Sequence, residues 1–210
     1  MKKTLHFIAL ALVMSLCRNA ATAADAAKPA VEKPEKKSSN LFCRPAKKAP
    51  AEQMAHADSL RDAGKVKEAG RQYDALVRKW GAAAEAPKAQ LEYARLLEKK
   101  GDYESAFDEY EYLIQNYTGN FNYSDVLESQ FKIANYVMTS RARFLGLFSS
   151  ASGLEKALPL FEKVILNGPR WSGTPQAQFN TGWIQEQLGE NELAAAAYEA
   201  VQQNYPTSKF

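Results

Sequence analysis

The chain has 210 residues, of which 46% are hydrophobic and 24% are charged. This balance is ordinary for a globular protein and excludes a wholly disordered chain, and the length suits one domain with a tail. Only two cysteines and two histidines occur. They exclude a disulfide scaffold and a histidine-rich metal site, so we expect no metal and no cofactor.

The formal net charge of +3 is unevenly distributed along the chain. Basic residues dominate before residue 51, whereas residues 51–210 contain 17 Lys and Arg against 21 Asp and Glu. A body with net negative charge is poorly suited to follow a phosphate backbone. We therefore do not expect nucleic acid as a partner.

The first 23 residues have the pattern of a secretory signal peptide. Lys2 and Lys3 precede an apolar run at 5–16, and small residues follow up to Ala23. The run is too short to span a bilayer stably, and cleavage is expected after Ala23. The pattern predicts a periplasmic protein whose contact with membranes is peripheral at most.

Cys17 raises the alternative of a lipoprotein. A lipoprotein signal requires a small residue directly before the cysteine, and Leu16 stands there. We therefore expect Cys17 to be discarded with the signal peptide, and we keep lipidation as the alternative. Residues 24–50 are rich in Ala, Lys and Pro and contain few large apolar side chains, so they are predicted to form a disordered linker.

Residues 51–210 contain an internal repeat. A glycine precedes an alanine by five residues, and a tyrosine follows that alanine by four. These sets are Gly64, Ala69, Tyr73; Gly101, Ala106, Tyr110; and Gly189, Ala194, Tyr198. A small residue, Ala57, Ala94 or Gly182, stands 12 positions before each alanine. A fourth set pairs Ala134 with Ala157 and Phe161 at a gap of 23, which predicts an insertion in the third repeat.

The spacing of apolar residues predicts a pair of helices in each repeat, with the glycine ending the first helix. The predicted helices cover 51–63, 66–80, 86–100, 103–117, 124–141, 153–167, 175–188 and 191–204. Thr174 and Pro175 are expected to cap and begin the seventh of them. The pattern resembles the tetratricopeptide repeat. We expect an all-α, right-handed solenoid of about four repeats, in which one pair alone cannot bury its apolar face.

A narrower resemblance is to the family of the outer-membrane protein assembly factor BamD. It is carried by residues 86–91 (APKAQL), 107–110 (FDEY) and 114–117 (IQNY), and by the insertion between the helices of the third repeat. The resemblance implies a non-catalytic scaffold at the inner face of the outer membrane. Its implied partners are the barrel-forming core component, unfolded outer-membrane proteins and other envelope proteins. Members of that family normally have about five repeats and a lipid anchor, so residues 205–210 are expected to lead into a further repeat.

Candidate binding residues follow from the repeat register, because the first helices of such solenoids line a groove that takes peptides. Arg61 and Arg95 are expected to hold carboxylates or carbonyl groups, and Asn135 to pair with a peptide main chain. The groove set is Asp58, Arg61, Arg95, Glu98, Asn135, Met138, Trp183 and Glu186, with Leu91, Phe131 and Phe179 at further groove positions. For several of these, packing against neighbouring helices is the alternative, and we favour it for Phe131 and Phe179.

The insertion is the second candidate site, because it contains several large apolar residues that loops usually avoid. We expect Phe144 and Leu147 to fold back into the core, and Arg141, Arg143 and Phe148 to contact a partner. No motif of an enzyme is present, and the carboxylates Asp108, Glu109 and Glu111 are best explained as a solvated helix face. A periplasmic repeat protein that coordinates cell-wall synthesis or division is the alternative function.

Overall fold

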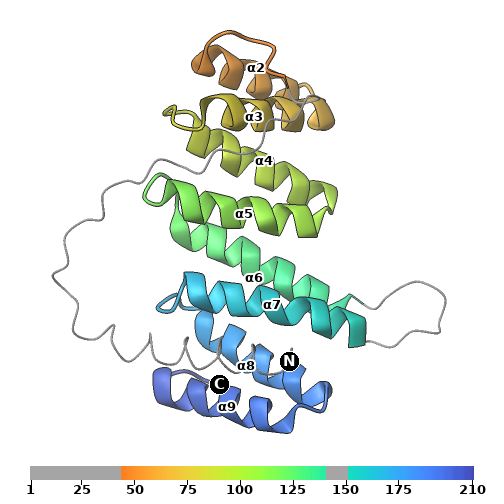
Figure 1. Ribbon diagram of the computed structural model, residues 1–210, viewed down its shortest axis with the longest axis vertical. Coiled ribbons are helices and arrows are strands. Elements are labelled where there is room, and N and C mark those ends of the chain that lie inside the picture. Colours follow the sequence, from red (N-terminus) through yellow and green to blue (C-terminus); the bar gives the residue numbers. More distant parts are fainter. Residues whose placement is uncertain (1–43, 141–150) are drawn as a thin grey trace, which may run out of the picture. The chain divides into compact units, whose positions relative to one another are not determined.

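A computed structural model describes residues 44–140 and 151–210 of the chain. Eight helices lie in these ranges, and no strand occurs there (Figure 1). In chain order they are α2 (Pro50–Asp62), α3 (Val66–Trp80), α4 (Ala86–Lys100), α5 (Tyr103–Tyr117), α6 (Tyr123–Thr139), α7 (Ala151–Asn167), α8 (Thr174–Gln187) and α9 (Asn191–Asn204). Every helix end lies within two residues of its predicted position, so the all-α repeat fold is confirmed.

The chain divides into two compact units, and each is described by itself. The described part of the N-terminal unit runs to Val126, and the C-terminal unit continues from Leu127, so α6 contributes to both. In the N-terminal unit, α2 packs on α3, α3 on α4, and α4 on α5. In the C-terminal unit, α7 packs on α8 and α8 on α9. The third repeat is lengthened between α6 and α7, where the insertion is predicted.

The core of each repeat is built from the repeated small and aromatic residues. In the first repeat both Ala57 and Tyr73 are fully buried. In the fourth repeat the small residue is Gly182, and a Cβ atom placed on it would lie 2.7 Å from the ring of Tyr198. Real Cβ atoms do not approach a ring so closely. The small residue therefore allows the second helix to lie close to the first, as predicted.

The turn between the two helices of a repeat depends on a glycine with a left-handed backbone. The φ angles are 74° for Gly64, 82° for Gly101 and 78° for Gly189. Side chains with a Cβ rarely adopt this conformation, which explains why the glycine recurs. In α4, the amide of Gly101 donates a hydrogen bond back to the carbonyl of Glu98, which closes the end of the helix.

The predicted cap of α8 is wrong. Thr174 lies within the helix, the N-cap is Gly173, and no side chain caps this end. The fully buried Thr174 hydroxyl donates instead to the carbonyl of Gly168, the first residue after α7. Gly173 is required because a Cβ atom there would collide with the ring of Trp171, at 2.2 Å. The Thr-Pro pair therefore marks the start of the helix correctly, but the Thr174 hydroxyl bonds to Gly168 and does not cap α8.

A buried glutamine recurs on the first helix of every repeat, four residues before the small residue. The four are Gln53, Gln90, Gln130 and Gln178, and none is more than 8% exposed. In three repeats the side-chain amide donates to the main-chain carbonyl just before the repeated tyrosine. These bonds are Gln53 to Gln72 at 3.0 Å, Gln90 to Glu109 at 2.8 Å, and Gln178 to Ala197 at 3.4 Å. Each fixes the register between the paired helices and satisfies a buried polar group.

A tyrosine at the end of a second helix joins neighbouring repeats. In the N-terminal unit, the Tyr117 hydroxyl donates to the carbonyl of Gly81 at 2.9 Å. In the C-terminal unit, the Tyr205 hydroxyl donates to the carbonyl of Pro169 at 3.1 Å. Donor and acceptor are 36 residues apart in both cases, so the same contact recurs once in each unit.

The residues just before α2 lie against the first repeat. The main-chain amide of Ala46 donates to Gln72 Oε1 at 3.0 Å, and that of Lys47 donates to Gln53 Oε1 at 2.9 Å. They form the end of the segment assigned to the linker from the sequence. The earlier residues of that segment and the predicted signal peptide lie outside the described residues.

Candidate functional site

The predicted groove residues lie on α2, α4, α6 and α8, the first helices of the four repeats. Residues at the same register have different chemistry in the two units. The position directly after the small residue is Asp58 on α2 and Arg95 on α4, but Asn135 on α6 and Trp183 on α8. The N-terminal unit therefore presents charges at this position, and the C-terminal unit presents an amide and an aromatic ring.

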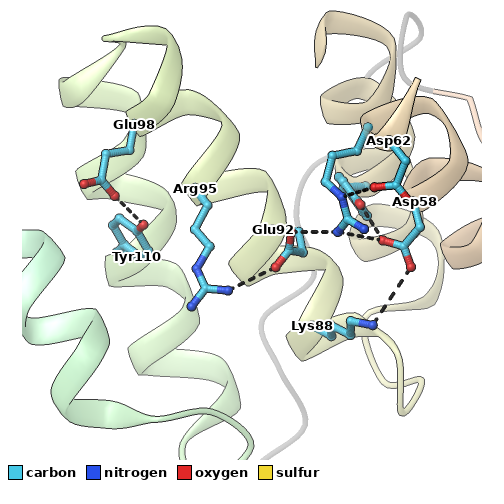
Figure 2. A network of polar contacts seen from close by, with 9 residues as sticks. Asp58, Asp62, Lys88, Glu92, Arg95, Glu98 and Tyr110 are labelled. Atoms are coloured by element: carbon cyan, nitrogen blue, oxygen red, sulfur yellow. Dashed lines mark hydrogen bonds and ion pairs between the residues drawn. The ribbon is translucent and has the colours of Figure 1, made fainter. Parts of the chain in front are cut away.

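Arg61 is the centre of an ion-pair network in the N-terminal unit. Its three acidic partners, Asp58, Asp62 and Glu92, are labelled in Figure 2. Its guanidinium lies 3.0 Å from Asp58, 3.0 Å from Asp62 and 2.9 Å from Glu92. The hydrogen bond with Asp62 contributes most to the raised pKa of Arg61, and the bond with Glu92 adds to it. The sequence predicted that Arg61 would bind a carboxylate of a ligand. In the structure it binds carboxylates of its own chain.

Glu92 extends this network along α4. It accepts from Arg61 through one carboxylate oxygen and from Arg95 through the other, the latter at 3.1 Å. Lys88 lies 3.9 Å from Asp58, and Figure 2 shows it approaching that carboxylate from α4. The Arg95 side chain is 50% exposed, compared with 32% for Arg61. Arg95 is therefore the more accessible of the two predicted arginines.

Three of the predicted groove carboxylates accept hydrogen bonds from the repeated tyrosines. Tyr73 donates to Asp58 at 2.6 Å, Tyr110 to Glu98 at 2.6 Å, and Tyr198 to Glu186 at 2.8 Å. The third repeat has Met138 where the second and fourth repeats have Glu98 and Glu186, and Phe161 where they have the tyrosine, so both the acceptor and the hydroxyl are replaced together. These carboxylates join the two helices of a repeat.

The same contacts alter the titration of the tyrosines. Burial, followed by the hydrogen bond to the Glu186 carboxylate, raises the pKa of Tyr198 to about 12. Burial and the hydrogen bond to Asp58 also raise the pKa of Tyr73. Both tyrosines therefore remain neutral donors at physiological pH, which suits a structural role.

In the C-terminal unit, α6 and α8 are joined by an asparagine pair. The Asn180 side-chain amide donates to Asn135 Oδ1 at 3.1 Å, and Asn135 Nδ2 donates to the carbonyl of Phe131 at 2.9 Å. Asn135 was predicted to pair with the main chain of a ligand. Asn135 is half-buried and its side chain bonds to its own chain, so fewer of its hydrogen-bonding groups are available to a ligand than the sequence indicated.

Two predicted groove residues on α8 are exposed. Trp183 is 39% exposed and Phe179 is 36% exposed, whereas Met138 on α6 is half-buried. Phe179 contacts Tyr198 at a ring-centroid distance of 5.4 Å, so packing accounts for only part of its surface. On the N-terminal unit, Leu91 is half-buried at the position that corresponds to Phe179.

Phe131 is half-buried and packs against neighbouring rings, as the packing alternative predicted. Its ring makes edge-on contacts with Phe161 at 5.8 Å and with Trp171 at 5.6 Å. The predicted insertion-loop residues Arg141, Arg143 and Phe148 lie outside the described residues, as do Phe144, Leu147 and Cys17. Their roles remain predictions.

Sequence reasoning missed the buried glutamines, although their repeated position before each small residue was a usable signal. It also missed the pocket of about 460 Å³ in the C-terminal unit, which is lined by Trp171, Pro175, Tyr205 and Phe210 among others. None of the predicted groove residues lines this pocket. Within the described ranges, no cluster of His, Cys, Asp and Glu is arranged to hold a metal ion. In the same ranges, no helix is both long and apolar enough to cross a membrane.

Two stretches of the chain, residues 54–121 and residues 176–208, match the tetratricopeptide repeat family. Among solved structures, the chain is similar to YrrB, described as a tetratricopeptide-repeat protein with an unusual peptide-binding site. The identity is 16% and the TM-score 0.40, over 75% of this chain and 70% of YrrB. No curated protein matches the chain significantly.

Two further solved structures are also similar to the chain. Tetratricopeptide-like repeats of a putative kinesin light chain from Podosopora anserina are 15% identical, with a TM-score of 0.39 over 95% of this chain and 87% of theirs. A thermophilic tetratricopeptide-repeat protein from Thermus thermophilus is 19% identical, with a TM-score of 0.34 over 76% of each chain.

The helix pairs and the two family matches define a tetratricopeptide-like repeat fold. This architecture is a scaffold for protein–protein interaction, because its stacked helix pairs present extended surfaces to other polypeptides. Such scaffolds are typically non-catalytic. The narrower resemblance to the BamD family remains a prediction.

Proposed function

We propose that the protein is a periplasmic, non-catalytic scaffold of the machinery that assembles β-barrel proteins in the outer membrane. It would position the core insertion component and unfolded barrel substrates. The observation that carries this proposal is the repeat array with a lengthened third repeat. There α6 ends at Thr139 and α7 begins at Ala151. The BamD family has its insertion between the same two helices.

The polar groups on the first helices support a binding role over chemistry. Arg61, Asp58 and Glu92 are engaged with one another, and the tyrosines hold the remaining groove carboxylates. A catalytic site would instead bring a nucleophile, a base and an electrophilic group together around a reacting atom. In the N-terminal unit, α2 and α4 offer an ordered polar face that suits recognition of another polypeptide.

The proposal is tested by affinity purification of the mature protein from envelope extracts, with the tag at its C-terminal end. In mild detergent, the barrel-forming core component and unfolded barrel proteins are expected to copurify. Recovery of envelope proteins without any component of barrel assembly would contradict the proposal. Arg95→Glu probes the accessible cation on α4, and Lys67→Glu on α3 makes the same charge change at an exposed position outside the predicted groove.

A deletion strain separates this function from a role in cell-wall synthesis or division. Loss of outer-membrane porins is expected if the protein serves barrel assembly. Chaining and septal defects with normal porin levels would favour the alternative. The mass of the mature N-terminus tests the localisation independently. A start at Ala24 is expected, whereas a diacylglycerol adduct on Cys17 would show a membrane anchor.

A further inference from the structure

Exposed large apolar side chains are confined to one unit of the described protein. All five of them lie in the C-terminal unit, namely Tyr136, Leu166, Phe179, Trp183 and Phe210. Two of these, Phe179 and Trp183, occupy predicted groove positions one helical turn apart on α8. An exposed aromatic pair at the positions that face a ligand in a repeat protein marks a contact surface.

We define the aromatic–amide surface as Phe179, Asn180 and Trp183 of α8 together with Asn135 and Met138 of α6. The hydrogen bond between Asn180 and Asn135 holds the two helices side by side at this point. The surface therefore combines two exposed rings, a half-buried thioether and an amide pair. All five residues belong to the C-terminal unit.

None of the five residues of this surface is charged, and the Lys209 ammonium lies 5.1 Å from the ring of Phe210, which contacts Phe179. Glu186 is the single charged residue of α8, and it accepts the hydrogen bond from Tyr198. Within the part of α6 that belongs to the C-terminal unit, Lys132 pairs with Glu128 at 3.3 Å. The matching part of the N-terminal unit carries the Arg61 network instead. An uncharged surface does not compensate the desolvation of a charged ligand, so it favours a ligand without charges.

The protein itself shows what kind of side chain this surface accepts. Phe210, from the segment after α9, lies on Phe179 with a ring-centroid distance of 5.6 Å and an interplanar angle of 37°. Phe179 also contacts Tyr198, so the site already gathers rings from separate segments. Aromatic pairs contribute beyond their buried area when the rings are tilted or offset in this way.

The polar groups of the surface suit a main chain. Among the described residues, the indole N–H of Trp183 has no acceptor and Asn180 Oδ1 has no donor, and both residues are at least partly exposed. A donor and an acceptor on neighbouring turns of one helix can bond to the carbonyl and amide groups of an extended segment. Side-chain charges on the ligand are not needed for these bonds.

We propose that the aromatic–amide surface binds an uncharged segment of a partner polypeptide through an aromatic side chain placed against Phe179 and Trp183. The Trp183 indole and the Asn180 amide bond to its main chain. The inference rests on the proposed role in binding polypeptides and specifies its ligand. The binding strength is expected to depend little on salt, because few charges are neutralised.

The test uses the mature protein and four synthetic peptides with capped ends. The first is an uncharged peptide of Ser, Gly and Asn with two Phe residues, and the second replaces both Phe residues with Ala. The third and fourth add flanking Glu or Lys residues to the first. Binding is followed through the indole N–H resonance of Trp183 and by calorimetry, at about 0.05 M and about 0.5 M salt.

The uncharged Phe peptide is expected to shift the Trp183 resonance, with an affinity that changes less than about twofold between the two salt concentrations. Trp183→Ala is expected to weaken it by about tenfold or more, a typical loss for an aromatic anchor. Lys67→Ala at an exposed position of α3, outside the predicted groove, is the control and should leave the affinity unchanged. Trp183→Phe keeps a ring and should retain most of the binding, which separates ligand contact from misfolding.

Three results would overturn the inference. In the first, the Ala peptide binds as strongly as the Phe peptide. In the second, a Glu or Lys peptide binds more strongly than the uncharged peptide, with a steep salt dependence. In the third, none of the four peptides binds. None of them decides the proposed function, because the envelope purification does not depend on the chemistry of these peptides. If the barrel components copurify but the peptides give one of these three results, the scaffold role stands and the proposal for this surface is rejected.

Discussion

The tyrosine–carboxylate pairs provide the sharpest test of how a repeat is held together. Tyr110 is 1% exposed, and its hydroxyl donates to Glu98 at 2.6 Å. A hydrogen bond to a charged acceptor contributes about 1.5–3 kcal/mol. Because Glu98 is partly exposed, we take the lower end of this range. Tyr110→Phe should therefore lower the free energy of unfolding by about 1.5 kcal/mol.

The acceptor can be removed separately. Glu98→Met leaves the hydroxyl of Tyr110 buried without this acceptor, which costs about 1–3 kcal/mol. The double variant places a phenylalanine and a methionine at these positions, the pair found in the third repeat as Phe161 and Met138. It should be more stable than the sum of the single effects indicates, with a coupling of about 1 kcal/mol or more.

The assay is urea unfolding followed by circular dichroism, with the four proteins of this cycle measured together. Tyr198→Phe is the control, since the Tyr198–Glu186 pair is exposed and should give a smaller loss, below about 1 kcal/mol. A coupling below about 0.3 kcal/mol would refute the reasoning, because the two side chains would then act independently.

Three further outcomes are expected. Gly182→Ala should destabilise the protein by about 1–3 kcal/mol in thermal unfolding, because the new Cβ would lie 2.7 Å from the Tyr198 ring; an unchanged melting temperature would contradict the close packing. Gln90→Leu should cost about 1–3 kcal/mol in urea unfolding by removing the hydrogen bonds that the Gln90 amide donates to the carbonyl and the carboxylate of Glu109, whereas wild-type stability would show that these bonds are dispensable. Finally, the pKa of Tyr198 is raised from 10.0 to about 12 in the folded state. The stabilisation from neutral Tyr198 should therefore be complete below pH 10 and lost as the pH rises through about 12. Tyr198→Phe should flatten this part of the curve of stability against pH. An identical curve for the variant would contradict the raised pKa.

The fold could be predicted closely because its signals are local. A left-handed glycine such as Gly101 and a small residue such as Ala94 each act within a few residues of their own position. Their repetition fixes the helix boundaries several times over, which explains the agreement at the helix ends. The prediction of the α8 cap was wrong because the Thr174 hydroxyl donates to the carbonyl of Gly168 instead. No local sequence pattern reveals this partner.

The candidate site was less predictable because it depends on contacts between helices. The register correctly placed Arg61 on a first helix but gave no information about Glu92, which is 31 residues away and occupies its guanidinium. It also could not show that Phe179, for which packing was favoured, is 36% exposed although its ring contacts Tyr198. Position along a repeat defines a face, and only the packed neighbours decide which side chains on that face are accessible.

The most direct test of the central claim, that the first helices bind other polypeptides, is photo-crosslinking from position 183 in living cells. A benzoylphenylalanine replacing Trp183 should give light-dependent adducts with envelope polypeptides, identified by mass spectrometry as components of barrel assembly. The same probe at the exposed Lys67 of α3 should give none of these adducts. Absence of adducts at position 183, or an equal yield from both positions, would contradict the account.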